Sequence, residues 1–401
     1  MTRFLNHPNI PFHALIEPAQ DAIRSHLGTS KSSATLIVHD WCMFGFKTHT
    51  AKQGRFKRTK AWDVGYELGS ALVVDAADGR PLGPMELRLR TAKAMLSTRV
   101  TETTKPPGHV DELIEVMNEA RRWDLGKTLI HVIDREADSV GHYRKWQSRG
   151  HQFLVRANQE RYVLWQDREQ HLSDVVAGLT REFREILLQD GKPEVVAIKG
   201  GTGRLFVAQT MVVLHRPAMT KIPGKRTAKG NKIKITVPGP SLPLRLVVTR
   251  VLDDDGKVLG EWCLLTNVME NQADAATVGR WYAWRWRVET YHKLLKTAGQ
   301  NAEEWQQETG EAFLARLCIA SMACLTVWHL QRDTTEEASQ LRKLLVRLSG
   351  RQMKHKVEST APALLAGLEK LLAIDDLLKN EDLDEILSLA RRVLPTLFSS
   401  G

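Results

Sequence analysis

The sequence lacks the signals that would direct it into or across a membrane. It contains no run of about 18 consecutive apolar residues, the length that a membrane-spanning helix needs. Its N-terminal stretch, MTRFLNHPNIPFHALIEPAQ, has neither an apolar core segment nor a small-residue cleavage site. We therefore expect no membrane span and no secretory signal peptide, and we expect a cytoplasmic protein.

Cysteine is also scarce. The 401 residues include four cysteines, Cys42, Cys263, Cys318 and Cys324, and none of them forms a Cys-x-x-Cys pair. Scattered cysteines of this kind are typical of reduced thiols and do not indicate a zinc site or a disulfide framework. A hydrophobic content of 42% and a charged content of 26% are ordinary for a globular protein of two or more domains.

Acidic residues are fewer than basic ones. Lys and Arg number 57 against 47 for Asp and Glu, which gives a net charge of +10. This excess favours a polyanionic partner, nucleic acid first. Basic residues gather in two stretches that are either solvated surface or contacts for phosphates. The first holds Lys47, Lys52, Arg55, Lys57, Arg58 and Lys60, and the second holds Lys221, Lys225, Arg226, Lys229, Lys232 and Lys234.

The order of predicted elements is that of a ribonuclease H-like α/β core. Strands joined by short links suit antiparallel pairs, and strands joined by helices suit parallel pairs, so we expect a mixed five-stranded sheet. Asp40 and Asp134 each end a strand, at the edge where open α/β sheets place their sites. The elements are a strand ending at Asp40, a hairpin turning near Asp78-Gly79, a helix at 109–123, a strand at 127–134, a helix closed by Gly150 and a strand at 151–157.

The rest of the chain divides around this core. A short N-terminal segment, 1–33, has one helix candidate, from Pro18 to Leu27. The first part of the core, 34–157, is followed by a predicted β-rich insertion, 158–276. The core resumes at 277–332, and a helical region follows at 333–401. The apolar stripes of these last helices predict core packing or, alternatively, a self-association surface.

One stretch, WYAWRWRVETYHKLLK at residues 281–296, contains no Gly or Pro and predicts a helix. On it, Tyr282, Arg285, Glu289 and Lys296 fall within a sector of about 60°. A carboxylate flanked by cations on one helical face suits a metal ion that meets a polyanion. The alternative is a solvated helix with a stabilising Arg285–Glu289 ion pair.

Three carboxylates can converge if the core folds as predicted. Asp40, Asp134 and Glu289 would repel one another around one cleft unless a cation balanced them. Oxygen-only ligands favour Mg²⁺ or Mn²⁺ over zinc, and two such ions can drive an in-line attack on phosphorus. The alternatives are an ion pair for Asp134 and a strand-end cap for Asp40.

These motifs together resemble those of bacterial DDE transposases of the insertion-sequence-four type, the group that includes the transposon-five enzyme. The signature Tyr-x2-Arg-x3-Glu-x6-Lys is complete on the predicted helix. DREAD, which starts at Asp134, is similar to the second-aspartate motif, and IVHDW places Asp40 at the first. GEWCLLTN and FLVRA are similar to two further strands of the family.

The resemblance implies a catalytic set of Asp40, Asp134 and Glu289 with two Mg²⁺ ions, which Mn²⁺ can replace. It also implies DNA contacts that hold backbone phosphates near the cleaved end. A tryptophan would stack on a base flipped out of the helix, and core packing is the alternative for that tryptophan. The implied contacts are Tyr282, Arg285, Lys293, Lys296, Arg156 and Trp262.

The implied reaction is cut-and-paste transposition by a homodimer on DNA, in the nucleoid. Water nicks the strand at the element tip, and the freed 3′-hydroxyl attacks the opposite strand to give a hairpin and later attacks target DNA. The chain departs from the family in having only 39 residues before Asp40, where other members carry a helical region that binds the end sequence. The alternatives are a shortened repressor that binds DNA without cutting it and a nuclease that acts on structured nucleic acid.

Overall fold

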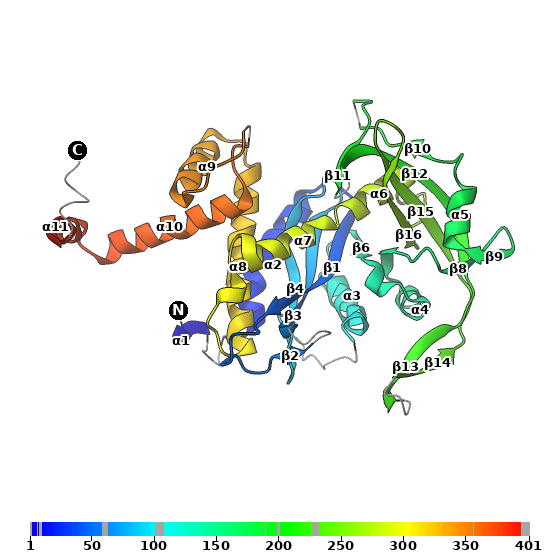
Figure 1. The fold of residues 1–401 in the computed structure, drawn as a ribbon, viewed down its shortest axis with the longest axis horizontal. Coiled ribbons are helices and arrows are strands. Elements are labelled where there is room, and N and C mark those ends of the chain that lie inside the picture. The colour runs from blue at the N-terminus through cyan, green and yellow to red at the C-terminus, as the bar shows by residue number, and fades with distance from the viewer. Residues whose placement is uncertain are drawn as a thin grey trace. The chain divides into compact units, whose positions relative to one another are not determined.

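The computed structural model describes residues 2–5, 7, 10–57, 63–100, 108–188, 190–198, 201–226, 232–355 and 357–393 (Figure 1). The chain separates into two compact units. The first contains Met1–Thr290 and Gln306–Cys318, and the second contains Tyr291–Trp305 and Ile319–Gly401. Asp40, Asp134 and Glu289 therefore belong to the same unit.

Five strands of the first unit have the predicted order and directions (Figure 1). The order across the sheet is β4-β3-β1-β6-β7. The pairs β4–β3 and β3–β1 are antiparallel, whereas β1–β6 and β6–β7 are parallel. This mixed arrangement is consistent with a ribonuclease H-like core. The strands are β1 (Ala34–Gly45), β3 (Val64–Asp75), β4 (Pro81–Arg90), β6 (Thr128–Ile133) and β7 (Gln152–Arg156).

The sheet is larger than the predicted five strands. The predicted β segments of the insertion do form strands, and β16 (Val258–Thr266) pairs antiparallel with β7. Beyond it lie β15 (Leu242–Leu252) and β12 (Gly201–Leu214), in a sheet of 14 strands. The edge of β7 would otherwise carry unpaired backbone groups, and β16 satisfies them.

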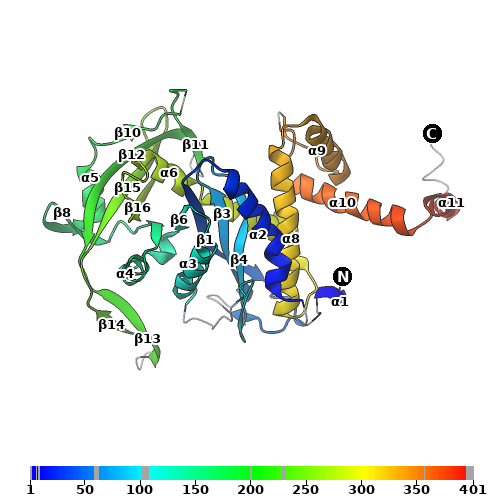
Figure 2. The same cartoon turned by 180° about the vertical axis from the view of Figure 1, so that it is seen from behind.

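Helices cover the core strands. Helix α2 runs over Phe12–Thr29, longer than predicted, with Pro18 inside it. It buries one face, which lies along strands β1, β3 and β4 in Figure 2. The helices α3 (Leu113–Arg122) and α4 (Val140–Ser148) form where they were predicted. Their apolar side chains join those of β6, β7 and the insertion strands in a second core cluster.

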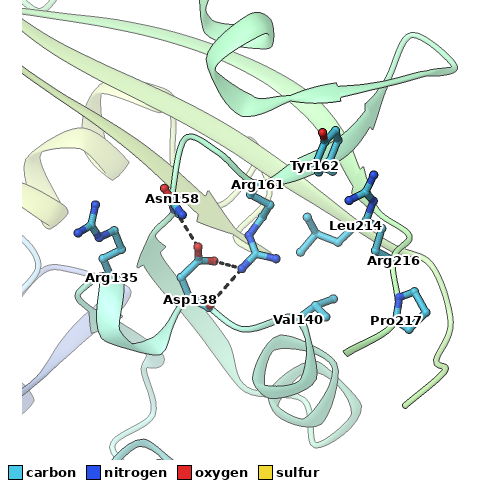
Figure 3. A pocket seen from close by; sticks show the side chains of 9 residues that line it. All are labelled: Arg135, Asp138, Val140, Asn158, Arg161, Tyr162, Leu214, Arg216 and Pro217. Atoms are coloured by element: carbon cyan, nitrogen blue, oxygen red, sulfur yellow. Dashed lines mark hydrogen bonds and ion pairs between the residues drawn. The ribbon is translucent and has the colours of Figure 1, made fainter. Parts of the chain in front are cut away.

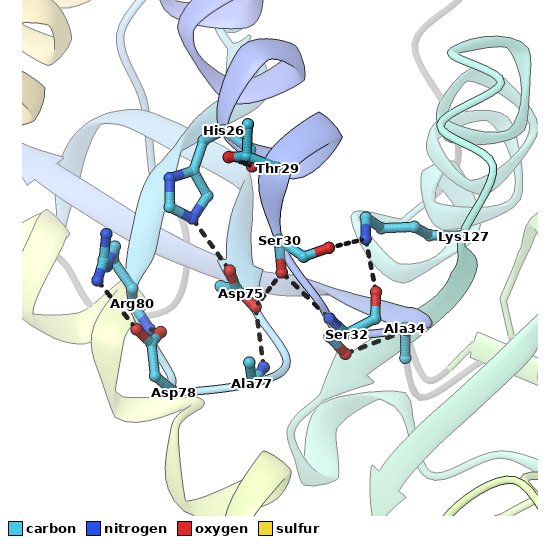
Figure 4. Close-up of polar contacts among 10 residues, drawn as sticks. All are labelled: His26, Thr29, Ser30, Ser32, Ala34, Asp75, Ala77, Asp78, Arg80 and Lys127. Carbon is cyan, nitrogen blue, oxygen red and sulfur yellow. Dashed lines mark hydrogen bonds and ion pairs between the residues drawn. The ribbon is translucent and has the colours of Figure 1, made fainter.

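A polar network fixes the end of α2 to the start of the β3–β4 turn (Figure 4). The carboxylate of Asp75 lies 3.0 Å from Nε2 of His26 and accepts hydrogen bonds from Ser30 Oγ at 3.1 Å and from Ala77 N at 2.9 Å. Lys127 Nζ in turn donates to the carbonyl oxygen of Ser30 at 2.9 Å. Burial by itself would raise the pKa of Asp75, but the hydrogen bonds from Ala77 N, His26 and Ser30 lower it.

The predicted turn at Asp78-Gly79 is confirmed, and it packs against the segment that precedes Glu289. Gly79 has a φ of +70°, and a Cβ placed on it would lie 2.4 Å from the ring of Trp284. Arg287 Nε donates to the Gly79 carbonyl oxygen at 3.2 Å. Only glycine combines this backbone angle with this close approach, so the turn holds the helical segment in place.

The C-terminal region is helical, as predicted. Its helices are α9 (Glu336–Ser349), α10 (Ala361–Asn380) and α11 (Leu383–Val393). Gly367 of α10 lies directly on α9, since a Cβ there would be 2.0 Å from the Leu345 carbonyl oxygen. The start of α10 is buried, and its later leucines, such as Leu372 and Leu378, are exposed.

One finding differs from the expectation about membranes. Helix α8 (Gly310–Arg332) is long enough and apolar enough to span a membrane by length and composition. Within the structure, 56% of its apolar stretch is buried. A core helix of a soluble protein meets the same test, so this feature is weak evidence for a span.

Candidate active site

The two predicted aspartates occupy neighbouring positions on adjacent strands. β1 and β6 pair in parallel up to His39↔Ile133, and Asp40 and Asp134 are the next residue on each strand. The prediction that Asp40 ends its strand is wrong, because β1 continues to Gly45 along its antiparallel partner β3. Asp134 directly follows β6, and its Oδ1 accepts a hydrogen bond from Glu136 N at 2.8 Å.

The single helix predicted for residues 281–296 is divided in the structure. Helix α6 (Ala275–Ala283) ends before Arg285, and α7 (Trp286–Lys293) begins after it. Backbone bonds such as Arg285 N to Tyr282 O, at 3.0 Å, tighten the chain between them. A wider π turn, Leu294–Ala298, follows α7. The tight turn places the Arg285 guanidinium among the acids.

Arg285 bridges two of the three acids. Its Nη1 lies 3.5 Å from Asp40 Oδ2, and its Nη2 lies 2.5 Å from Glu289 Oε1. The Arg285–Glu289 ion pair, predicted as an alternative, is therefore present. It does not form on a solvated helix face, however, because the Arg285 side chain is buried and only 8% exposed. In this arrangement the guanidinium supplies the positive charge that clustered carboxylates need.

The three carboxylates act on one another electrostatically. Burial raises the pKa of Asp40 to about 6; Arg285 opposes this rise, and the negative charges of Asp134 and Glu289 add to it. In the described ranges, no three Asp, Glu, His or Cys side chains are arranged to hold a metal ion. The residues nevertheless fit a divalent ion, because the donors are all oxygen and a cation would relieve the unfavourable charge of Asp40.

The comparison with known families agrees with this geometry. Residues 92–326 match the transposase DDE domain, which is more than half of the chain. The chain belongs to this family. DDE transposases are enzymes that cut DNA and transfer its strands, and they generally use divalent metal ions. The matched residues include Asp134 and Glu289, and Asp40 lies before them.

Two further predicted site residues of this transposase lie close to the acids. Burial raises the pKa of Tyr282, the charges of Arg285 and Arg156 oppose the rise, and that of Asp134 adds to it. These residues therefore share one electrostatic environment. The buried Tyr282 hydroxyl has Arg285 as a neighbour that lowers its pKa, but it makes no well-formed hydrogen bond among the described residues, so its O–H could turn to a ligand.

Trp262 lies on the same face of the sheet as Arg156. Leu264 of β16 pairs with Arg156 of β7, and Trp262, two residues earlier on β16, shares the face of Leu264. Trp262 is half-buried, whereas the neighbouring Cys263 and Leu265 are buried in the core. Lys293, the last residue of α7, and Lys296 belong to the second unit, where Lys296 Nζ lies 3.3 Å from Glu303 Oε1.

The two basic stretches are only partly the surfaces that charge counting suggests. Lys52 is buried, and its Nζ donates to the Gln307 carbonyl oxygen at 2.6 Å. Arg55 donates to backbone carbonyl oxygens, including that of Phe46 at 2.7 Å. The second stretch forms a two-stranded ribbon of β13 (Ala218–Arg226) and β14 (Lys232–Val237), not a loop. Arg58, Lys60 and Lys229 lie outside the described residues.

His109 links residues near both aspartates, and sequence reasoning did not identify it as a site residue. Its Nε2 lies 2.8 Å from Glu136 Oε2, and its Nδ1 lies 3.3 Å from Glu67 Oε1. Its ring stacks on Trp41, the residue after Asp40, with centroids 4.6 Å apart. Glu136 is part of the DREAD motif. Its acidic side chain was the one feature of the sequence that could have indicated a basic partner nearby, which the structure shows to be His109.

We expect His109→Gln to destabilise this transposase below about pH 7 and to have a smaller effect near pH 10. Burial by itself would lower the pKa of His109, but Glu136 and Glu67 raise it to about 9. A raised histidine pKa adds stability that is complete below the unfolded value of about 6.5 and is lost as pH rises through about 9. Allowing for partial exposure, the contribution is about 1–2 kcal/mol.

The measurement is the difference in thermal unfolding midpoint between variant and wild type at pH 6 and pH 10. Taking the difference cancels groups that titrate alike in both proteins. An equal deficit at both pH values would mean that His109 acts through packing on Trp41 and not through its charge.

Proposed function

We propose that this enzyme performs metal-dependent cut-and-paste transposition of an insertion sequence, with Asp40, Asp134 and Glu289 as the metal-holding acids. The observation that carries the proposal is the register of β1 and β6, which makes Asp40 and Asp134 neighbours. Glu289 joins them through Arg285 and through its effect on the pKa of Asp40. In this proposal, three acids from distant parts of the sequence would form one site.

Two Mg²⁺ or Mn²⁺ ions, when bound, would activate a water molecule and stabilise the leaving oxygen of a phosphodiester. The three carboxylates would hold them, and Arg285 would shift its contacts from the acids toward the DNA. Tyr282, whose hydroxyl makes no well-formed hydrogen bond among the described residues, would donate its O–H to a phosphate oxygen. The proposed products are a nicked strand with a 3′-hydroxyl, then a hairpin formed by attack on the opposite strand, and finally a joint with target DNA.

The DNA-binding part of the proposal adds Arg156, Lys293, Lys296 and Trp262. Arg156 and the two lysines would contact backbone phosphates. Trp262 would stack on a base that leaves the helix at the transposon end, which offsets part of the cost of unstacking. We further propose that the enzyme acts as a homodimer on DNA in the bacterial nucleoid.

The test uses purified protein, Mn²⁺ and a duplex carrying the terminal inverted repeat read from DNA flanking the gene. Strand nicking at the tip, followed by a hairpin and strand transfer, would support the proposal. Binding without any product would instead support a repressor of transposition. Cleavage without preference for the repeat, and without strand transfer, would support a nuclease of structured nucleic acid. An EDTA control separates binding from chemistry.

We expect Trp262→Ala to leave the first nick intact and to reduce the hairpin yield roughly tenfold. A stacked base contributes about 1–3 kcal/mol, and a tenfold effect corresponds to about 1.4 kcal/mol within that range. Denaturing gels that resolve nicked and hairpin products provide the measurement. Trp262→Phe keeps an aromatic ring and should restore much of the yield. An unchanged hairpin yield in the alanine variant would remove this role.

A further inference from the structure

A polar pocket of about 520 Å³ opens beside the DREAD segment (Figure 3). It lies where the chain leaves β12 for the basic ribbon of β13 and β14. Three separate segments of the first unit line it: the turn after β6 with the start of α4, the link from β7 into β8 (Tyr162–Trp165), and the chain from the end of β12 onward. The lining residues are Arg135, Asp138, Val140, Asn158, Arg161, Tyr162, Leu214, Arg216 and Pro217.

Each of the three segments contributes one arginine to the pocket. Arg135, Arg161 and Arg216 are spread across it in Figure 3. The one acid in the lining, Asp138, is already engaged within the protein. Its Oδ1 accepts from Arg161 Nη2 and from Tyr143 Oη, both at 2.7 Å, and its Oδ2 accepts from the Asn158 backbone N–H at 2.8 Å. Even with the carboxylate counted, the lining has an excess of positive charge.

Arg216 is held at the pocket by contacts on its Nε and on its flat face. Its guanidinium carbon lies 3.5 Å from the ring centre of Tyr162. Its Nε donates to Glu169 Oε1 at 2.8 Å. Glu169 is 41% exposed, and an ion pair this exposed is weak. An anion with several oxygens can therefore compete for the guanidinium, whose planar fork matches a phosphate.

We propose that this pocket binds a backbone phosphate of the DNA strand that passes the acid site, with Arg216 as the principal contact. The proposal rests on the proposed function, since it deepens how the same site holds its substrate. Arg135 directly follows Asp134 in the chain, so the pocket begins next to the acids. A strand that leaves the acid site along this side meets positive charge before it reaches the basic ribbon.

A phosphate suits the pocket better than a base does. Stacking a base requires an open aromatic face, but Arg216 lies against the Tyr162 ring and the His171 ring centre is 3.9 Å from that of Tyr162. The Tyr162 ring is therefore already in contact with two side chains, although 37% of the residue remains exposed. What the pocket offers instead is charged N–H donors, which are the groups that bind phosphate oxygens.

The experiment measures binding of a mixed-sequence duplex by fluorescence anisotropy in EDTA, over a series of salt concentrations. Phosphate contacts do not depend on sequence, so the element's own ends are not needed. We expect Arg216→Gln to weaken binding several-fold and to reduce the slope of log K against log salt by about 0.9, the change for one phosphate contact. Glu169→Gln, which removes the negative charge that competes with phosphate for Arg216, should leave binding unchanged or make it tighter.

Arg122→Gln is the matched control, because Arg122 is also exposed and pairs with a carboxylate, that of the partly buried Glu119, at 2.8 Å. It should not change the slope. If Arg216 has only a structural role, Glu169→Gln and Arg216→Gln will weaken binding alike and lower the thermal midpoint alike, which would overturn the proposal. An Arg216→Gln variant that loses affinity for inorganic phosphate but keeps the DNA slope would also overturn it, because the pocket would then serve a free anion.

The result of this binding assay does not depend on whether the proposed function is correct. It is carried out without metal and records no cleavage, so an altered salt slope can be found whether or not the protein nicks DNA. Conversely, nicking that depends on the acids would stand even if Arg216→Gln left the salt slope unchanged.

Discussion

Glu289→Gln is expected to reduce strand nicking by roughly 10³-fold or more, because removing one member of a catalytic set that acts as a unit costs about as much as removing the set. The amide keeps the size of the side chain and an oxygen that can still accept from Arg285. It loses the negative charge with which a carboxylate holds a divalent ion. DNA affinity should stay within about twofold, or rise slightly, since a negative charge near the phosphates is removed.

The measurement is the single-turnover nicking rate in Mn²⁺, with duplex affinity measured separately in EDTA. Glu182→Gln serves as the control, because Glu182 is an exposed acid of the same unit and lies outside the site. The assignment of Glu289 would be wrong if the variant nicked DNA at the wild-type rate. A parallel loss of affinity and rate would instead indicate a disturbed Arg285, the partner that Glu289 contacts.

Local sequence patterns were sufficient to predict the central strands and the position of Asp134 after β6, but not that β1 continues past Asp40. Apolar runs marked β1, β6 and β7, and the glycine at Gly79 marked the turn of the hairpin. The length of each link then indicated whether neighbouring strands run parallel or antiparallel. These features predicted that the acids could converge, and the structure then gave the register that brings Asp40 beside Asp134.

Features that depend on distant partners could not be predicted in this way. The pairing of β7 with β16 joins residues more than 100 positions apart, so nothing near either strand indicates it. The tight turn at Arg285 likewise interrupts a stretch with no helix-breaking residue, and its arginine contacts an acid 245 residues away. Counting charges also could not show that Lys52 is buried against a carbonyl oxygen while Lys47 and Lys57 are exposed.

Asp40→Asn is expected to stabilise the metal-free protein while abolishing nicking. Burial raises the pKa of Asp40 from 3.8 to about 6. The positive charge of Arg285 opposes this rise, and the negative charges of Asp134 and Glu289 add to it. An acid with a raised folded pKa binds its proton more tightly in the folded state, so its ionised form reduces stability. The penalty is absent below the unfolded value of 3.8, grows as pH rises, and is complete above about pH 6.

Two pKa units correspond to at most about 3 kcal/mol, so we expect Asp40→Asn to gain about 1–3 kcal/mol at pH 8 and little at pH 4. The measurement is the thermal unfolding midpoint in EDTA at both pH values, with Asp21→Asn as an exposed control. Mn²⁺ should raise the midpoint of the wild type more than that of the variant, because the ion relieves the charge that the variant lacks. A variant that is less stable than wild type at pH 8 would mean that Arg285 fully compensates the buried carboxylate, and that the site is built around an ion pair and not around a missing cation.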